Sequence, residues 1–89
     1  MLRLSPVLDL GAAAPLWRGL CEARGAAIEI DASQVERIGG LCLQVLLAAR
    51  TQWRADGRSF AIVQPSAAFA DGVRLMAAAD LAPQQEDVQ

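Results

Sequence analysis

The fold of this chain can be inferred from one segment, "AAIEIDASQVERIGGLCLQVLLAA", residues 26–49. Its opening residues, 26–31, end in alternating apolar and acidic side chains, which is the period of a strand with one face on a core. Its closing part has apolar residues at helical spacing, which predicts a helix over residues 40–55. The paired glycines Gly39 and Gly40 stand where that helix begins. The segment therefore predicts a strand–turn–helix unit, the kind of unit from which α/β folds are built.

The N-terminal part of the chain predicts a strand and a helix of its own. Residues 2–8, "LRLSPVL", are expected to form an edge strand or a strand with a bulge, because Pro6 cannot donate to a ladder. Residues 12–23 predict a helix with Pro15 in its first turn, where a missing N–H costs least. Gly25 then fits a C-terminal stop.

The C-terminal part adds a third strand and a third helix. Residues 59–65, "SFAIVQP", predict a strand after a turn at Gly57, which suits a left-handed conformation. Ser66 is a good N-cap for a helix over residues 67–78. Strand and helix alternate three times, which favours an α/β fold with a central, mostly parallel sheet of three or four strands and helices packed on it. Crossovers are expected to be right-handed.

A predicted core follows from these spacings. The two acidic residues of the central strand, Glu29 and Asp31, are expected on its solvent side. Cys21 and Cys42 form no CxxC and are expected to be buried, reduced thiols. Inward positions are expected at Ala13, Leu16, Trp17, Leu20, Ile28, Ile30, Val35, Ile38, Leu43, Leu46, Leu47, Trp53, Phe69, Val73 and Met76.

Composition excludes several classes of function. The chain contains no His, which removes zinc sites of the Cys/His type and every His-dependent catalytic triad. Glu29 and Asp31 are interpreted as solvated strand charges rather than a catalytic pair, and neither a metal nor a cofactor is expected. A net charge of −2 and a pI of 4.9 argue against a nucleic-acid binder.

Length and hydropathy predict one small domain over residues 1–83 with a polar tail over residues 84–89. The longest apolar run, "LCLQVLLAA", falls far short of the ~20 residues that span a bilayer. The first ten residues lack the apolar region of a signal peptide. We therefore expect a cytoplasmic protein with no direct membrane insertion.

Residues 28–47, "IEIDASQVERIGGLCLQVLL", resemble the signature of the STAS domain, the fold shared by sulfate transporters and anti-sigma factor antagonists. That signature has an apolar strand, Asp-Leu-Ser, a Val, an apolar residue, Asp-Ser-Ser/Thr-Gly and an amphipathic helix. The resemblance covers roughly residues 26–81 and implies the STAS fold. The positions that match in order and spacing are Asp31, Ser33, Val35, Ile38, Leu43 and Leu46.

The chain departs from this signature at the paired glycines. Gly40 stands where antagonists of the family expose a Ser for phosphorylation by a partner kinase, and Gly39 replaces the neighbouring Asp. Glycine has no hydroxyl, so no phosphoacceptor is expected there. Three interpretations of the pair remain open. It forms a tight turn with positive φ or close backbone approach, a docking surface without its switch, or an anion site at the helix start.

The predicted helix over residues 40–55 carries a second apolar stripe, at Leu41, Val45, Ala48 and Gln52. A helix that is apolar over much of its circumference is either deeply buried or offers a patch to a partner. The charges of Glu36 and Arg37 are interpreted either as solvated or as rim contacts with a partner. The candidate partner-binding residues are Ser33, Glu36, Arg37, Gly39, Gly40, Leu41, Gln44, Val45 and Ala48.

The resemblance implies a non-enzymatic signalling module that docks through residues 35–48 on a protein partner. That partner is an anti-sigma factor of the histidine-kinase-like type or a chemotaxis-type regulatory protein. One alternative is a STAS subunit of an ABC transporter of the phospholipid-trafficking type, which contacts the transporter's ATPase. A small-ligand sensor is another alternative. A homodimer, formed through residues 2–8 or the apolar helix, is a further expectation.

Overall fold

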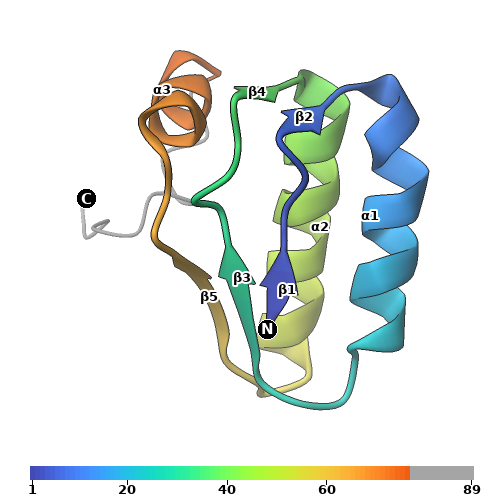
Figure 1. The fold of residues 1–89 in the computed structure, drawn as a ribbon. Helices are drawn as coiled ribbons and strands as arrows, with labels where there is room; N and C mark the ends of the chain where they lie inside the picture. The colour runs from blue at the N-terminus through green and yellow to red at the C-terminus, as the bar shows by residue number, and fades with distance from the viewer. Residues whose placement is uncertain (77–89) are drawn as a thin grey trace.

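The structure, a computed structural model, describes residues 1–76, in which the elements follow the order ββαββαβα (Figure 1). The predicted polar tail, residues 84–89, therefore lies outside the described residues. The elements are β1 (Leu2–Arg3), β2 (Val7–Leu8), α1 (Leu10–Glu22), β3 (Ile28–Asp31), β4 (Arg37–Ile38), α2 (Gly40–Ala55), β5 (Phe60–Val63) and α3 (Ala67–Leu75).

The main sheet is parallel and has the strand order β1-β3-β5. Leu2 pairs with Ile30, and Ile28 pairs with Phe60, so β3 is the central strand. This confirms the predicted α/β fold with a mostly parallel sheet. The edge position of β1 also agrees with the prediction for the N-terminal segment.

The N-terminal segment forms two strands rather than the single strand predicted over residues 2–8. The chain turns at Pro6, and β2 pairs in parallel with β4 in a separate two-stranded sheet. The carbonyl oxygen of Pro6 accepts from the backbone N–H groups of Glu36 and Arg37 at 2.6 and 3.1 Å. The loop predicted between β3 and α2 therefore contains a short strand, because the N-terminal segment supplies it with a partner.

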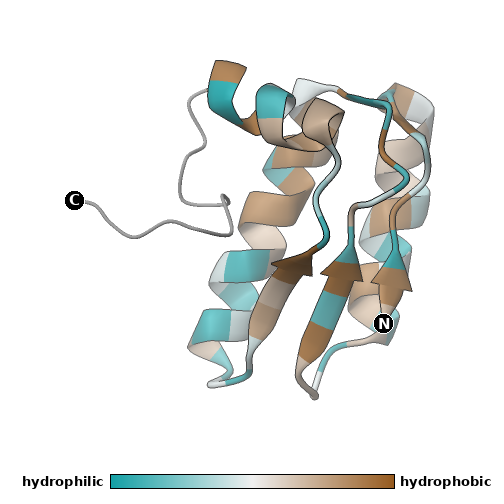
Figure 2. Cartoon of the chain, turned by 60° about the vertical axis from the view of Figure 1, so that its left-hand side comes forward, coloured by the Kyte–Doolittle hydropathy of each residue, from teal (hydrophilic) through white to brown (hydrophobic). Residues whose placement is uncertain are grey.

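Helices α1 and α2 cover the same face of the main sheet (Figures 1 and 2). Ile28 and Ile30 of β3 point into this layer, and the strand alternates in hydropathy as a half-buried strand should (Figure 2). Helix α3 lies beside β4 at the carboxyl end of the sheet. The buried apolar residues are Leu4, Leu8, Ala13, Leu16, Leu20, Ile28, Ile30, Ala32, Val35, Cys42, Leu43, Leu46, Ala49, Trp53, Phe69 and Val73.

Helix α1 begins at Leu10, two residues before the predicted start. Asp9 is its N-cap, and the Asp9 side chain accepts from the backbone N–H of Ala12 at 3.2 Å. The prediction that Pro15 lies in the first turn is therefore wrong, because Pro15 stands inside the helix. Beyond the C-terminal end, Gly25 has a φ of 99°, as a helix stop requires.

The prediction of a buried Trp17 is also wrong, since 48% of its surface is exposed. Ala13, Leu16 and Leu20 are buried and make the contact with the core. Trp17 and Cys21 are one helical turn apart on a neighbouring stripe, so both side chains turn toward solvent. Cys21 is exposed, which corrects the prediction of two buried thiols.

Helix α2 has the predicted bounds of residues 40–55, and its stripe of Leu43, Leu46 and Trp53 is buried as predicted. Leu47 is half-buried against the core. Ser66 caps α3 as predicted, with its hydroxyl accepting from the backbone N–H of Phe69 at 3.0 Å. The prediction of an inward Met76 is wrong, because α3 ends at Leu75 and Met76 is 36% exposed. Residues 77–78 of the predicted helix lie outside the described residues.

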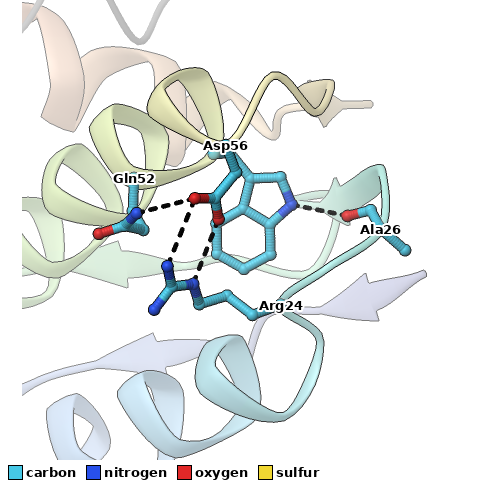
Figure 3. A network of polar contacts seen from close by, with 5 residues as sticks. Arg24, Ala26, Gln52 and Asp56 are labelled. Atoms are coloured by element: carbon cyan, nitrogen blue, oxygen red, sulfur yellow. Dashed lines mark hydrogen bonds and ion pairs between the residues drawn. The ribbon is translucent and has the colours of Figure 1, made fainter.

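Polar contacts join the segment after α1 to the C-terminal end of α2, at the amino end of the sheet (Figure 3). The indole Nε1 of Trp53 donates to the carbonyl oxygen of Ala26 at 2.8 Å. The guanidinium of Arg24 contacts the Asp56 carboxylate at 3.2 Å, and Gln52 donates to the same carboxylate at 3.1 Å. These contacts fix the segment between α1 and β3 against the end of α2.

Candidate functional site

The candidate residues lie at the carboxyl end of the parallel sheet, where the chain passes from β3 through β4 into α2 (Figure 1). In open α/β sheets this end is the usual place for recognition, because the loops there are carried by fixed strands. The site is therefore best built outward from the last residue of β3.

Asp31 ends β3 and is buried, with only 7% of its surface exposed. The expectation that it faces solvent beside Glu29 is thus wrong. Its carboxylate accepts from the backbone N–H of Ser33 at 2.9 Å and lies 3.6 Å from the Arg3 guanidinium. Hydrogen bonds from the Ser33 side chain and backbone, with help from Arg3, hold the pKa of Asp31 below its ordinary value.

Ser33 is consequently turned inward and half-buried, although it was among the predicted partner-binding residues. Its hydrogen bonds to Asp31 shape the start of the loop, as Ser commonly does in such turns. Val35 is buried, which confirms its predicted role as an inward anchor. Ile38 is half-buried against the core.

The turn into α2 is held by backbone bonds to β2. The N–H of Gly39 donates to the carbonyl oxygen of Leu8 at 2.9 Å, one pair beyond the Leu8–Ile38 register. Gly39 is the N-cap of α2, and no side chain caps this helix. Glu36 and Arg37, just before it, are exposed.

The structure also tests the first interpretation of the glycine pair, the tight turn. Gly39 has a φ of −95°, and Gly40 does not have a positive φ, so the expected left-handed turn is absent at both residues. A Cβ added at Gly39 would lie 3.4 Å from the carbonyl oxygen of Leu8, while one added at Gly40 would meet nothing within 4 Å. A side chain at Gly39 would therefore pack at the short end of ordinary contact with Leu8. Neither dihedral angle nor space requires a glycine at position 40.

The exposed face of α2 carries one large apolar side chain, Leu41, in its first turn. Leu41 is 49% exposed, and Gln44 and Ala48 are exposed on later turns of the same helix. Val45 is half-buried against the core. The predicted second stripe is therefore only partly covered within the described part of the chain.

Sequence reasoning missed Leu10, the first residue of α1, which is 78% exposed. The thiol of Cys42 donates to the carbonyl oxygen of Asp9 at 3.3 Å, so the first turns of α1 and α2 lie side by side. Leu10 follows Asp9 in the chain, and Leu41 precedes Cys42. The missed signal was Asp9, a strong N-cap residue that marks the true start of α1.

An open hollow of about 350 Å³ lies beside the turn. It is lined by Asp9, Arg37, Gly39 and the side chains or backbone of Val7, Leu8 and Ile38. Asp9 and Arg37 give it one charge of each sign. Among residues 1–76, no group of three or more His, Cys, Asp or Glu side chains could hold a metal ion. No helix in that range is long and apolar enough to cross a membrane.

The fold is that of a small α/β protein with a parallel sheet, and the candidate residues lie at the carboxyl end of that sheet. Residues 1–83 match the family described as "Mlab, STAS domain", and the chain therefore belongs to the STAS domain family. STAS domains are generally non-enzymatic and act through protein–protein interaction. Searches of curated proteins and of solved structures gave no match to this chain.

Proposed function

We propose that the chain is a non-enzymatic signalling module that binds a protein partner through residues 35–48, here called the docking surface. The partner is an anti-sigma factor of the histidine-kinase-like type or a chemotaxis-type regulatory protein. Because position 40 carries no hydroxyl, phosphorylation at that position does not switch the binding off. The protein acts in the cytoplasm.

The observation that carries the proposal is the combination of Leu41 and Gly40 at the start of α2. Leu41 is 49% exposed, and half-exposure of a Leu forgoes about 1 kcal/mol of burial free energy. Gly40 is exposed, and the fold does not require a glycine there. Because the first residue of α2 has no side chain, a partner can approach the backbone closely there and bury the adjacent exposed Leu side chain.

Flanking charges favour a specific encounter. Glu36 and Arg37 are exposed on the strand and loop that lead to the turn, at the rim of the apolar surface. Rim charges of opposite sign contribute mainly to association rate and to choice of partner. The docking surface thus has an apolar centre and a charged rim, which is the usual arrangement of a protein interface.

The test is an affinity pull-down from an extract of the native cell, with bound proteins identified by mass spectrometry. Wild type is compared with Leu41→Glu, which places a charge at the centre of the docking surface. We expect recovery of the specific partner to fall by about tenfold or more, since a central anchor carries much of an interface's binding free energy. A kinase-like or chemotaxis-type protein lost in this variant supports the proposal.

Trp17→Glu is the matched control. Trp17 has almost the same exposed fraction as Leu41, 48% against 49%, and lies in α1 outside residues 35–48. The control is expected to retain the partner. Circular dichroism of both variants shows whether they are folded. Equal recovery by wild type and folded Leu41→Glu rules the docking surface out.

A second candidate function is a STAS subunit that remains bound to the ATPase of an ABC transporter of the phospholipid-trafficking type. Two observations favour it. The matching family is described by the name Mlab, and Gly40 lacks the hydroxyl that a phosphorylation switch needs. A permanent subunit requires no such switch. Recovery of an ATPase and its permease in the same pull-down, again lost in Leu41→Glu, identifies this function in place of the first.

A further inference from the structure

Gly72 lies inside α3, at a place where glycine weakens a helix. Replacing an interior glycine by alanine usually favours the helix by about fivefold in equilibrium constant. A Cβ added at Gly72, however, would lie 2.5 Å from Cγ2 of Ile38, whereas carbon atoms in good contact lie about 3.5–4.0 Å apart. The missing side chain at position 72 is thus what allows α3 to approach β4 this closely.

The N-terminus of α3 is tied to the same loop by a second set of contacts. The Ser66 hydroxyl donates to the carbonyl oxygen of Val35 at 2.6 Å and accepts from the N–H of Phe69 at 3.0 Å. The N–H of Ser66 donates to the carbonyl oxygen of Ala32 at 3.0 Å. Ser66 therefore binds the β3–β4 loop and caps its own helix with one side chain.

These two contacts of α3 are made with the N-terminal part of the docking surface. Val35 is its first residue, and Ile38 directly precedes Gly39, the N-cap of α2. The Gly39 carbonyl accepts from the N–H of Leu43 at 3.1 Å, so a shift of β4 moves the first turn of α2 as well. Leu41, in that first turn, is half exposed.

We infer that α3 sets the position of β4 and of the α2 start, so that Gly72 and Ser66 are positioning residues for the docking surface. The biological consequence rests on the proposed function, but the mechanical link does not. Both residues act through Ile38 and Val35 rather than by touching a partner. The contact of Gly72 with Ile38 is steric, and the contact of Ser66 with Val35 is a hydrogen bond.

The test is residue-resolved amide hydrogen exchange on the full chain, which needs no partner. In Gly72→Ala the new methyl group pushes Ile38 away. We expect exchange of the Arg37 and Gly39 amides, which donate to Pro6 and Leu8, to rise about tenfold. The Ile28 amide, bonded to Ser59 in the main sheet, is expected to keep its rate.

A second substitution that restores the exchange rate of the Gly39 amide distinguishes a positioning role from a general loss of stability. Ile38→Ala removes the Cγ2 atom that the new methyl meets, so the Gly72→Ala/Ile38→Ala double variant is expected to return Gly39 to within about twofold of Ile38→Ala alone. The matched control is Gly19→Ala in α1, where an added Cβ makes an ordinary 3.5 Å contact with Leu2. That variant should leave the Gly39 amide unchanged.

Ser66→Asp provides a test that does not depend on Gly72→Ala being folded. Aspartate keeps the N-cap acceptor for Phe69 but has no hydroxyl to donate to Val35. We expect α3 to persist and the Glu36 and Arg37 amides to exchange faster. Unchanged rates at residues 36–39 in folded variants, or an equal rise at Ile28, overturn the inference. Such a result leaves the proposed docking role intact, since Leu41→Glu tests that role separately.

Discussion

The two glycines of the pair differ in how closely other atoms approach them. Gly39 lies against the carbonyl oxygen of Leu8, and its N–H bonds to the same atom. Gly40 has open space around it and a dihedral angle that other residues adopt. The backbone around Gly39 is thus packed closely against Leu8, whereas neither space nor dihedral angle calls for a glycine at position 40.

Gly40→Ala is therefore expected to stabilise the protein. An alanine at a position with compatible backbone geometry reduces the entropy of the unfolded chain, with a gain of about 0.5 kcal/mol in unfolding free energy. Urea denaturation followed by circular dichroism measures the change. Gly57→Ala is the control, because Gly57 has a φ of 70° and should lose stability. A destabilised Gly40→Ala would mean that the helix start needs glycine after all.

The two thiols are expected to differ in reactivity. Cys21 is exposed, whereas Cys42 is buried between α1 and α2 with its thiol donating to Asp9. Burial, and the nearby charge of Asp9, raise the pKa of the Cys42 thiol, which lowers its thiolate fraction. A chromogenic disulfide reagent at neutral pH should titrate one thiol rapidly and the second only on denaturation. Rapid titration of both thiols, or loss of the fast phase only in Cys42→Ser, would contradict this assignment.

At the scale of the element, helices with complete local signals were predictable and short strands were not. Helix α2 has the predicted bounds because its apolar spacing runs unbroken from one glycine turn to the next. Helix α1 begins two residues before the predicted start, because the prediction rests on Pro15 as a first-turn residue whereas the N-cap is Asp9. Strand β4 has two residues and depends on Pro6 and Leu8, about 30 positions away, so no local pattern indicates it.

The same limit applies to the candidate site. The second apolar stripe left two outcomes open for Leu41, burial or exposure, and the structure shows that Leu41 is exposed. The inward orientation of Ser33 could not be predicted from the sequence, because it depends on the burial of Asp31 by residues distant in sequence. The proximity of the two helix starts also depends on distant residues, since the Cys42 thiol donates to Asp9 and the Gly39 N–H donates to Leu8.

Pro15 lies near the middle of α1 and interrupts the hydrogen bonding of that helix. A proline inside a helix removes one backbone hydrogen bond and crowds the preceding turn. Pro15 is exposed, so Pro15→Ala leaves the core contacts of Ala13 and Leu16 in place. We expect it to raise the unfolding free energy by about 1–3 kcal/mol. Thermal and urea unfolding measure this change, and a lower midpoint would show that the rest of the fold requires the distortion.

At the scale of the whole molecule, two carboxylates make polar contacts that stabilise opposite ends of the main sheet. Asp31 sits at the carboxyl end with Ser33 and Arg3, and Asp56 sits at the other end with Arg24 and Gln52. The pKa of each is lowered, chiefly by the Ser33 hydrogen bonds for Asp31 and by the Arg24 hydrogen bond for Asp56. In both places the charged form of the carboxyl group is the one that the folded state favours.

Lowering the pH should therefore weaken the contacts of Asp31 and Asp56, at the two ends of the main sheet, over the same range of pH. A carboxyl group with a lowered pKa in the folded state binds fewer protons folded than unfolded. Its stabilisation is complete above the unfolded pKa, near 3.9, and is lost as pH falls through the folded value. The urea midpoint of the wild type is expected to decline as the pH is lowered from 5 to about 2.5.

Isosteric variants assign that decline to the two residues. Asp31→Asn keeps an oxygen that can accept from the Ser33 N–H but does not titrate, so its midpoint should be lower than wild type at pH 5 and should depend less on acid. Asp56→Asn should behave in the same way at the other end, and the double variant should show the flattest profile, because the two sites share no contact. Asp71→Asn is the control, since Asp71 is exposed and pairs with Arg74 one turn further along α3. An acid profile of Asp31→Asn that parallels the wild type would show that this carboxylate does not hold the carboxyl end of the sheet.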